Sequence, residues 1–129
     1  MQNFRGLNVW RKGHRLTLQI YKITAGFPQD ERFGLTSQLR RACASICANL
    51  AEGCCRSSAK DFARFVDMAI GSASEVEYFL LLARDLGHVA EPVYASLDEQ
   101  VWEVKRMLTS LSQRLRSKSA SSKLMVDGG

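Results

Sequence analysis

The chain has 129 residues, of which 46% are hydrophobic, and a formal net charge of +5. A chain of this length is expected to form one domain that buries roughly two-thirds of its unfolded surface, so it needs no disulfide framework to fold. No apolar run approaches the ~20 residues of a membrane-spanning helix, and no hydrophobic block of a signal peptide follows the N-terminus. The sequence therefore predicts a soluble cytoplasmic protein.

The first predicted helix covers residues 8–25, where apolar side chains recur at alternating spacings of four and three. Gly26 and Pro28 end it. Residues 1–29 contain five basic and no acidic side chains, so most of the net charge belongs to this segment. Such asymmetry indicates an acidic partner, and nucleic acid is the simplest one.

The second predicted helix covers residues 31–52, with Asp30 as its N-cap and Gly53 as a C′ residue of positive φ. Its second half, residues 42–51, has no charge and almost no large side chain. A surface helix normally keeps one polar face, so we expect this helix to be covered on more than one side. A single bundle covers only one side, which predicts an oligomer.

The third predicted helix covers residues 59–86, with Ser57 or Ser58 as N-cap and Gly87 as its end. Gly71 lies in the middle of this helix, where an exposed glycine would cost about 1 kcal/mol relative to alanine. We interpret Gly71 as a point of close helix approach, against the alanines of the second helix.

The fourth predicted helix covers residues 92–116 and has the clearest heptad pattern in the chain. Residues 117–129 are rich in serine and have no periodicity, which predicts a mobile tail. Four long helices with short connections favour an all-α, up-down-up-down antiparallel four-helix bundle over residues 1–116.

The residues resemble a known family, the four-helix-bundle proteins encoded in intervening sequences of large-subunit ribosomal RNA genes, which were formerly classed among the ribosomal proteins. The resemblance covers nearly the whole chain before the tail. The matching positions are Val9, Trp10, Lys12, His14, 35–42, Ser45, Ile46, Asn49, 51–53, Phe62, Arg64, Phe65, Gly71, Ser72, Glu75, Glu77 and 84–87.

This resemblance implies a bundle that assembles as a ring-like homopentamer. It also implies a kinship with accessory variability proteins, which assist the reverse transcriptases of diversity-generating retroelements. Nucleic-acid binding is the activity usually proposed for the family.

Catalysis is not expected from the sequence. Glu75 and Glu77 are two residues apart and point to different faces of a helix, and no Glu-x-x-His ligand motif occurs. No phosphate-binding glycine loop and no nucleophile elbow are present. The four cysteines have neither disulfide nor zinc-site spacing, so we expect buried thiols, no metal and no cofactor; a redox or metal role is the alternative.

The candidate nucleic-acid contacts are basic side chains that can neutralise successive phosphates with little sequence readout. They are Arg11, Lys12, Arg15, Lys22, Arg40 and Arg41. Gln19 extends the row on the first helix. The alternative is that the first-helix residues form a solvated face, and that Arg40 and Arg41 pair between subunits with Glu52, Glu75 or Glu77. Trp10 and Trp102 are interpreted as bundle anchors, so no base-stacking platform is expected.

A second set of residues is assigned to helix packing and assembly. Small side chains admit a neighbouring helix, Asn49 can specify register as a buried amide, and Glu52 needs an arginine partner at the negative end of its helix. The set consists of Ala44, Ala48, Asn49, Ala51, Glu52 and Gly71.

The sequence thus favours a non-enzymatic homo-oligomer that binds structured RNA or DNA mainly through the phosphate backbone. The alternative is a protein-interaction scaffold, such as an accessory subunit of a reverse transcriptase or another polymerase. The expected partners are other copies of the chain and nucleic acid, with no membrane.

Overall fold

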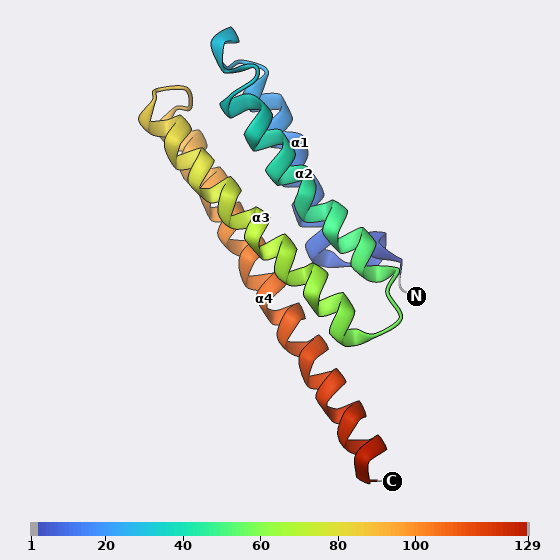
Figure 1. Ribbon diagram of the computed structural model, residues 1–129. Coiled ribbons are helices and arrows are strands. Elements are labelled where there is room, and N and C mark those ends of the chain that lie inside the picture. The colour runs from blue at the N-terminus through green and yellow to red at the C-terminus, as the bar shows by residue number, and fades with distance from the viewer. Residues whose placement is uncertain (1–2, 129) are drawn as a thin grey trace.

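Four α-helices make up the fold in a computed structural model that describes residues 3–128 and the side chains of residues 3–121. Successive helices run in opposite directions (Figure 1). Residues 3–128 contain no strand, so the predicted all-α class is confirmed. The elements in chain order are η1 (Phe4–Gly6), α1 (Asn8–Thr24), η2 (Gln29–Glu31), α2 (Leu35–Cys54), α3 (Ala59–Asp85) and α4 (Glu91–Gly128).

Helix α3 begins and ends at the residues that its capping chemistry predicts. The Ser58 side chain accepts a hydrogen bond from the Asp61 amide at 3.0 Å. At the other end Gly87 has a φ of 79°, and the amides of Gly87 and His88 donate to the carbonyls of Arg84 and Ala83 at 2.9 Å each. This pair of bonds is a Schellman motif, in which glycine takes the left-handed conformation without a side-chain penalty.

Helix α2 begins later than the sequence predicts. Asp30 is not its N-cap, because residues 29–31 form the separate 3₁₀ turn η2 and α2 starts at Leu35. The Glu31 carboxylate instead accepts a hydrogen bond from the Leu35 amide at 3.3 Å. A Cβ at Gly34 would lie only 2.9 Å from that oxygen, so the missing side chain leaves room for this contact.

Gly53 is not a C′ residue. It lies inside α2, which ends at Cys54, and Gly87 is the one glycine of positive φ among residues 3–128. A Cβ at Gly53 would lie 2.8 Å from Cδ1 of Phe62 and 3.0 Å from Cβ of Phe65. Gly53 is therefore required by the close approach of α3, not by backbone conformation.

Helix α4 continues through the residues predicted as an aperiodic tail. It extends to Gly128, so residues 117–128 are helical. No proline or glycine interrupts residues 117–127, and each residue added to a helix gains a hydrogen bond without new nucleation. In Figure 1 this end of α4 projects beyond the other helices. Residues 1–2 and 129 of the predicted ranges lie outside the described residues.

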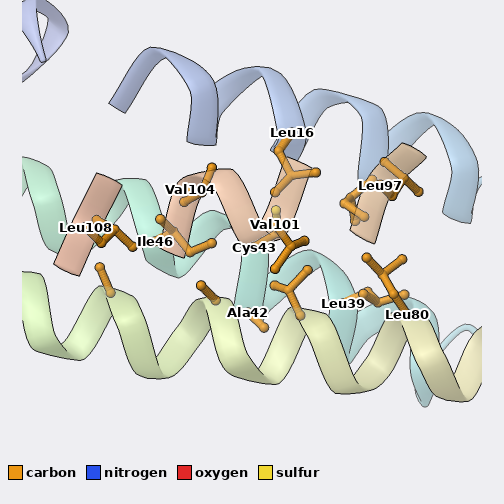
Figure 2. Packing of buried hydrophobic residues seen from close by; sticks show 14 of the residues in the cluster. Leu16, Leu39, Ala42, Cys43, Ile46, Leu80, Leu97, Val101, Val104 and Leu108 are labelled. Atoms are coloured by element: carbon orange, nitrogen blue, oxygen red, sulfur yellow. The ribbon is translucent and has the colours of Figure 1, made fainter. Parts of the chain in front are cut away.

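The core lies along the bundle axis and receives side chains from all four helices. Figure 2 shows Leu16 of α1, Ile46 of α2, Leu80 of α3 and Val104 of α4 directed into the same interior, and all four are fully buried. Each belongs to an apolar row with the spacing of an amphipathic helix. This packing determines which side chains of each helix remain for function.

Candidate nucleic-acid interface

The basic face of α1 lies beside α4, and their facing side chains are long and polar. Lys12 Nζ lies 2.5 Å from Glu103 Oε1, and both side chains are 42% exposed. Gln19 and Gln100 exchange two hydrogen bonds through their amide groups, at 2.8 and 3.1 Å. These pairs hold α1 and α4 together at the surface; we call this contact the α1–α4 seam.

Two hollows open along the α1–α4 seam. The larger, of about 430 Å³, lies at the N-terminal end of α1 and includes Asn8, Met107, Ser110 and Arg114 in its lining. The smaller, of about 320 Å³, is lined by Lys12, Arg15, Gln19, Gln100, Glu103 and Val104. The side chains at the smaller hollow are mainly polar, with basic groups from α1, whereas the larger hollow is mainly apolar and has Arg114 of α4 as its basic group.

The Lys12 ammonium lowers the pKa of Glu103, the carboxylate opposite it. Its hydrogen bond, together with its charge and the charges of Arg106 and Arg15, lowers the pKa of Glu103 below the usual glutamate value, against a smaller opposing effect of burial. Glu103 therefore remains an anion at neutral pH. It neutralises Lys12 and leaves Arg15 as the main positive group of the smaller hollow.

The other basic residues of α1 are exposed but differ in their contacts. The Arg11 guanidinium donates to the Arg5 carbonyl at 3.0 Å and to the Asn8 side chain, so it also holds the start of α1. Lys22 is exposed in the last turn of α1, where its positive charge interacts favourably with the negative end of the helix dipole. All four predicted α1 residues thus lie at the surface, and Lys12 and Arg15 line the α1–α4 seam.

Arg40 is placed by the structure away from the α1–α4 seam. Its Nε donates to Thr24 Oγ1 at 2.8 Å, its terminal nitrogen donates to the Tyr21 carbonyl at 3.1 Å, and its charge lies 4.6 Å from the centre of the Tyr21 ring. The guanidinium therefore caps the C-terminal end of α1, which is a structural use of its charge.

Arg41 pairs within the chain. It lies 3.8 Å from the Glu75 carboxylate and donates to Gln38 at 2.8 Å. The acids considered as intersubunit partners also find partners inside the chain: Glu52 pairs with Arg56 at 2.7 Å. Glu77 pairs with Lys105 at 2.9 Å. Arg56 is therefore the arginine partner that Glu52 was expected to need.

Arg106 and Arg114 of α4 belong to the site but were not predicted from the sequence. Arg114 lines the larger hollow, and the charge of Arg106 acts on Glu103. The signal was present, because residues 103, 107, 110 and 114 have helical spacing and flank the apolar row of α4. Which flank faces α1 depends on the packing.

The family of the chain follows from comparison with known proteins. The model of a family described as the 23S rRNA-intervening sequence protein matches residues 5–110. The chain belongs to this family. A comparison with curated proteins finds no significant match.

A solved structure agrees with the fold of this chain. It is a crystal structure of a protein of unknown function from the S23 ribosomal protein family of Bacteroides thetaiotaomicron. The likeness has a TM-score of 0.76 at 24% identity and covers 81% of this chain and 95% of that one. At this identity the likeness supports the fold alone.

The family match includes most of the α1–α4 seam. Lys12, Arg15, Gln19, Gln100 and Glu103 lie within residues 5–110, whereas Arg114 and the last turns of α4 lie beyond them. The seam therefore lies mainly within the residues that the family model matches.

The predicted assembly residues of α2 lie on its outer side. Ala48 is exposed, and Ala44 and Ala51 are half-buried. Asn49 is also half-buried, and its amide donates to the Ser45 carbonyl at 2.9 Å and to the Ser45 hydroxyl at 3.1 Å. The amide is therefore satisfied locally within α2.

Gly71 does not pack against the alanines of α2. It is exposed, and a Cβ built on it would meet no atom within 4 Å. The helix approach expected at Gly71 occurs instead at Gly53. The prediction was wrong because the position of a glycine in a helix does not show which side of α3 faces α2.

Trp102 is not a bundle anchor. Its side chain lies on the outer surface of α4 with 44% of the residue exposed. Trp10 is half-buried, with ring centroids 5.0 Å from Phe4 and 4.9 Å from His14. The anchor assignment therefore suits Trp10 and is wrong for Trp102.

The cysteines mostly match the expectation of buried thiols. Burial raises the pKa of Cys43 to about 11 despite a hydrogen bond from Thr17, and burial together with Cys43 raises that of Cys47 to about 12. Cys54 is also buried, whereas Cys55 is exposed. Within the part of the chain that the structure describes, no three metal-ligating side chains group together and no helix is long and apolar enough to span a membrane.

Proposed function

We propose that this protein is a non-enzymatic homo-oligomer that binds structured RNA or DNA along the α1–α4 seam. The observation that carries the proposal is the pair of hollows between the two helices, with Lys12 and Arg15 at the smaller one and Arg114 at the larger one. A phosphate backbone that follows the seam would meet positive groups of α1 at the smaller hollow and Arg114 of α4 at the larger one. Because these groups reach phosphates and not base edges, sequence readout would be small.

The charge distribution supports this assignment. The N-terminal segment that contains α1 carries five basic and no acidic side chains. Neutralising phosphates with these groups releases condensed counterions, which makes binding strong at low salt and weak at high salt. Arg15 and Lys22 are exposed, and among the described residues neither forms an ion pair, so both can contribute without breaking an internal contact.

Arg40 and Arg41 take a smaller role in this proposal than the sequence suggested. Arg40 caps α1 and Arg41 pairs with Glu75, so using either for a phosphate would compete with an existing contact. Arg114, which lines the larger hollow, replaces them as the second source of positive charge.

Self-association is part of the proposed function. Ala48 and Gly71 are exposed, and a mid-helix glycine with no neighbour costs stability in an isolated chain. A second copy packed on this surface would use the small side chains, and repeated basic seams would add avidity. The family resemblance implies a ring of five copies. Light scattering of the full chain at micromolar concentration should give a mass of several chains, and a monomer would contradict this part.

A salt-dependent titration tests the nucleic-acid proposal. We expect the triple variant Arg11→Ser, Lys12→Ser, Arg15→Ser to bind RNA and duplex DNA more weakly. The slope of log affinity against log salt should fall by up to about three, because each lost phosphate contact removes about one unit. Fluorescence anisotropy with labelled RNA and duplex DNA at several salt concentrations measures both quantities.

A matched control removes the same charge elsewhere. The variant Arg32→Ser, Lys60→Ser, Arg64→Ser changes three basic residues that do not line the α1–α4 seam. It should keep most of the affinity and of the slope. Absence of binding at low salt, or an equal loss in both triple variants, would show that the seam is not the binding surface.

The alternative function, a scaffold for a polymerase or reverse transcriptase, is favoured by exposed apolar side chains at one end of the bundle. Phe33 is 87% exposed and Leu86 is 52% exposed, on two connections joined by the 3.0 Å pair of His88 and Glu31. Location of the gene beside a retroelement would favour this function, and location inside a ribosomal RNA gene would favour the first.

A further inference from the structure

Trp102 forms an exposed aromatic surface on α4 that the bundle does not use. It occupies the outer side of the helix together with Arg106, Thr109 and Gln113, which follow it at spacings of four, seven and eleven residues. A tryptophan left 44% exposed gains less from burial than one in the core, so packing does not explain its position.

The indole ring is held in place by an ion pair beneath it. Lys105 Nζ lies 4.7 Å from the centre of the Trp102 ring and 2.9 Å from Glu77 Oε1 of α3. The Lys105 and Glu77 side chains are only 19% and 29% exposed. Because Lys105 is fixed to α3, it restricts the ring that it contacts. A preorganised ring loses less conformational entropy when a ligand stacks on it.

A shallow hollow of about 290 Å³ lies beside the ring. It is lined by Trp102, Lys105, Arg106, Thr109, Ser110 and Gln113. Ser110 also lines the larger hollow of the α1–α4 seam, where its hydroxyl accepts a hydrogen bond from Arg114 at 2.8 Å. The aromatic surface and the basic seam therefore meet at Ser110.

The chemistry around the ring fits an unpaired base. An aromatic face next to a guanidinium, with hydroxyl and amide groups around it, combines base stacking with phosphate neutralisation, as in proteins that bind single strands. A duplex offers no free base face, because its bases stack on one another.

We propose that Trp102 stacks on an unpaired base of a single-stranded nucleic acid, whose backbone passes Arg106 and continues into the α1–α4 seam. This inference rests on the proposed nucleic-acid function of the seam and assigns it a preference for strands with unpaired bases. RNA and DNA share the stacked base, so the preference concerns strandedness and not the sugar.

The test compares labelled single strands of about 12 nucleotides, a length within the usual site sizes, with a duplex of the same length. Trp102→Ala should weaken binding of single-stranded RNA and DNA by about five- to 150-fold, the range typical of a lost base stack, and leave duplex affinity unchanged. Trp102→Phe, which keeps an aromatic face, should retain most of the single-strand affinity.

A second measurement does not depend on the alanine variant being folded. The chain has two tryptophans, Trp10 and Trp102, so Trp10→Phe leaves Trp102 as the single indole. Adding either single strand should quench its fluorescence, and adding the duplex should quench it much less. Circular dichroism melting verifies that each variant is folded.

The outcomes separate this inference from the proposed function. If Trp102→Ala keeps full single-strand affinity while the Arg11, Lys12, Arg15 variant loses it, the stacking inference is wrong and the seam proposal stands. Equal losses for single strands and duplex, or no quenching of Trp102, also overturn the stacking. If the unaltered protein binds no nucleic acid at low salt, both proposals are wrong.

Discussion

The contact between α2 and α3 differs from the α1–α4 seam in the size of the side chains that meet. At the first contact Gly53 faces the Phe62 ring, and the hydroxyls of Ser45 and Ser72 lie 2.9 Å apart. At the second, the lysine–glutamate pair and two glutamines span the distance between the helices. One contact is closed by small residues, and the other is bridged by long polar ones.

The difference explains where a ligand can enter. Small side chains let the helix backbones approach, so rings from one helix fill the space and exclude water. Long charged side chains keep their polar ends in water and leave hollows between their stems. The α1–α4 seam is therefore open because of its residues, and the same four-helix fold provides both a dry contact and a wet one.

Removing the ring at the closed contact should have the largest effect on stability. Phe62 is 7% exposed, and we expect Phe62→Ala to lower the free energy of unfolding by about 3–5 kcal/mol, through lost burial and a new cavity. Urea denaturation measures this. Phe33→Ala is the matched control, because Phe33 is 87% exposed and should change stability by only about 0.5 kcal/mol. Similar losses in both variants would contradict the contrast between the two positions.

Adding one methyl group at two glycines of the bundle should give opposite signs. Gly53→Ala places a Cβ 2.8 Å from the Phe62 ring and should cost about 1–3 kcal/mol of stability through overpacking. Gly71→Ala meets no atom within 4 Å and should stabilise the single chain by up to about 1 kcal/mol through helix propensity. Thermal melting should show a lower melting temperature for Gly53→Ala and a higher one for Gly71→Ala than for the unaltered protein. A destabilised Gly71→Ala would instead indicate that another chain packs on this surface.

The smallest effect on stability is expected at the open seam. Glu103→Gln removes an exposed ion pair, and such pairs contribute little to folding. Because the folded protein lowers the pKa of Glu103, its contribution is present above the ordinary glutamate pKa and disappears as the pH falls through the lowered value. Urea denaturation near pH 7 should therefore show the variant slightly less stable, and the difference should vanish once the pH lies below the lowered pKa of Glu103.

The same substitution should strengthen nucleic-acid binding. Glu103→Gln frees Lys12 and removes the acid from the smaller hollow, so affinity at low salt should rise, whereas Glu99→Gln on the exposed side of α4 serves as control. Equal affinity of Glu103→Gln and the unaltered protein would mean that Lys12 does not contact the ligand.

Local features of the chain were predictable because they depend on neighbouring residues. Ser58 caps α3 through an amide three residues away, and Gly87 ends it through bonds that span five residues or fewer. The apolar rows of the helices follow from their periodicity in the same way. Gly53 was wrongly predicted to follow the end of α2. Glycine is common at that position, but here it lies inside α2 and permits a close contact with α3.

The candidate site was predictable only in part. The sequence identified the basic face of α1, since Arg11, Lys12 and Arg15 share one helix surface. It could not show that α4 supplies Arg106 and Arg114, or that Trp102 points outward. These depend on the rotation of one helix against another, which periodicity alone does not determine.

The sequence by itself determined four helices, most of their ends and an excess of positive charge near the N-terminus. Only the tertiary structure decided which contact between helices is closed, which is open and which side chains line it. The physical reason is distance along the chain: Lys12 and Glu103 are 91 residues apart, and Gln19 and Gln100 are 81 apart. Such pairs meet only after the core has packed, so the open seam is a property of the assembled bundle.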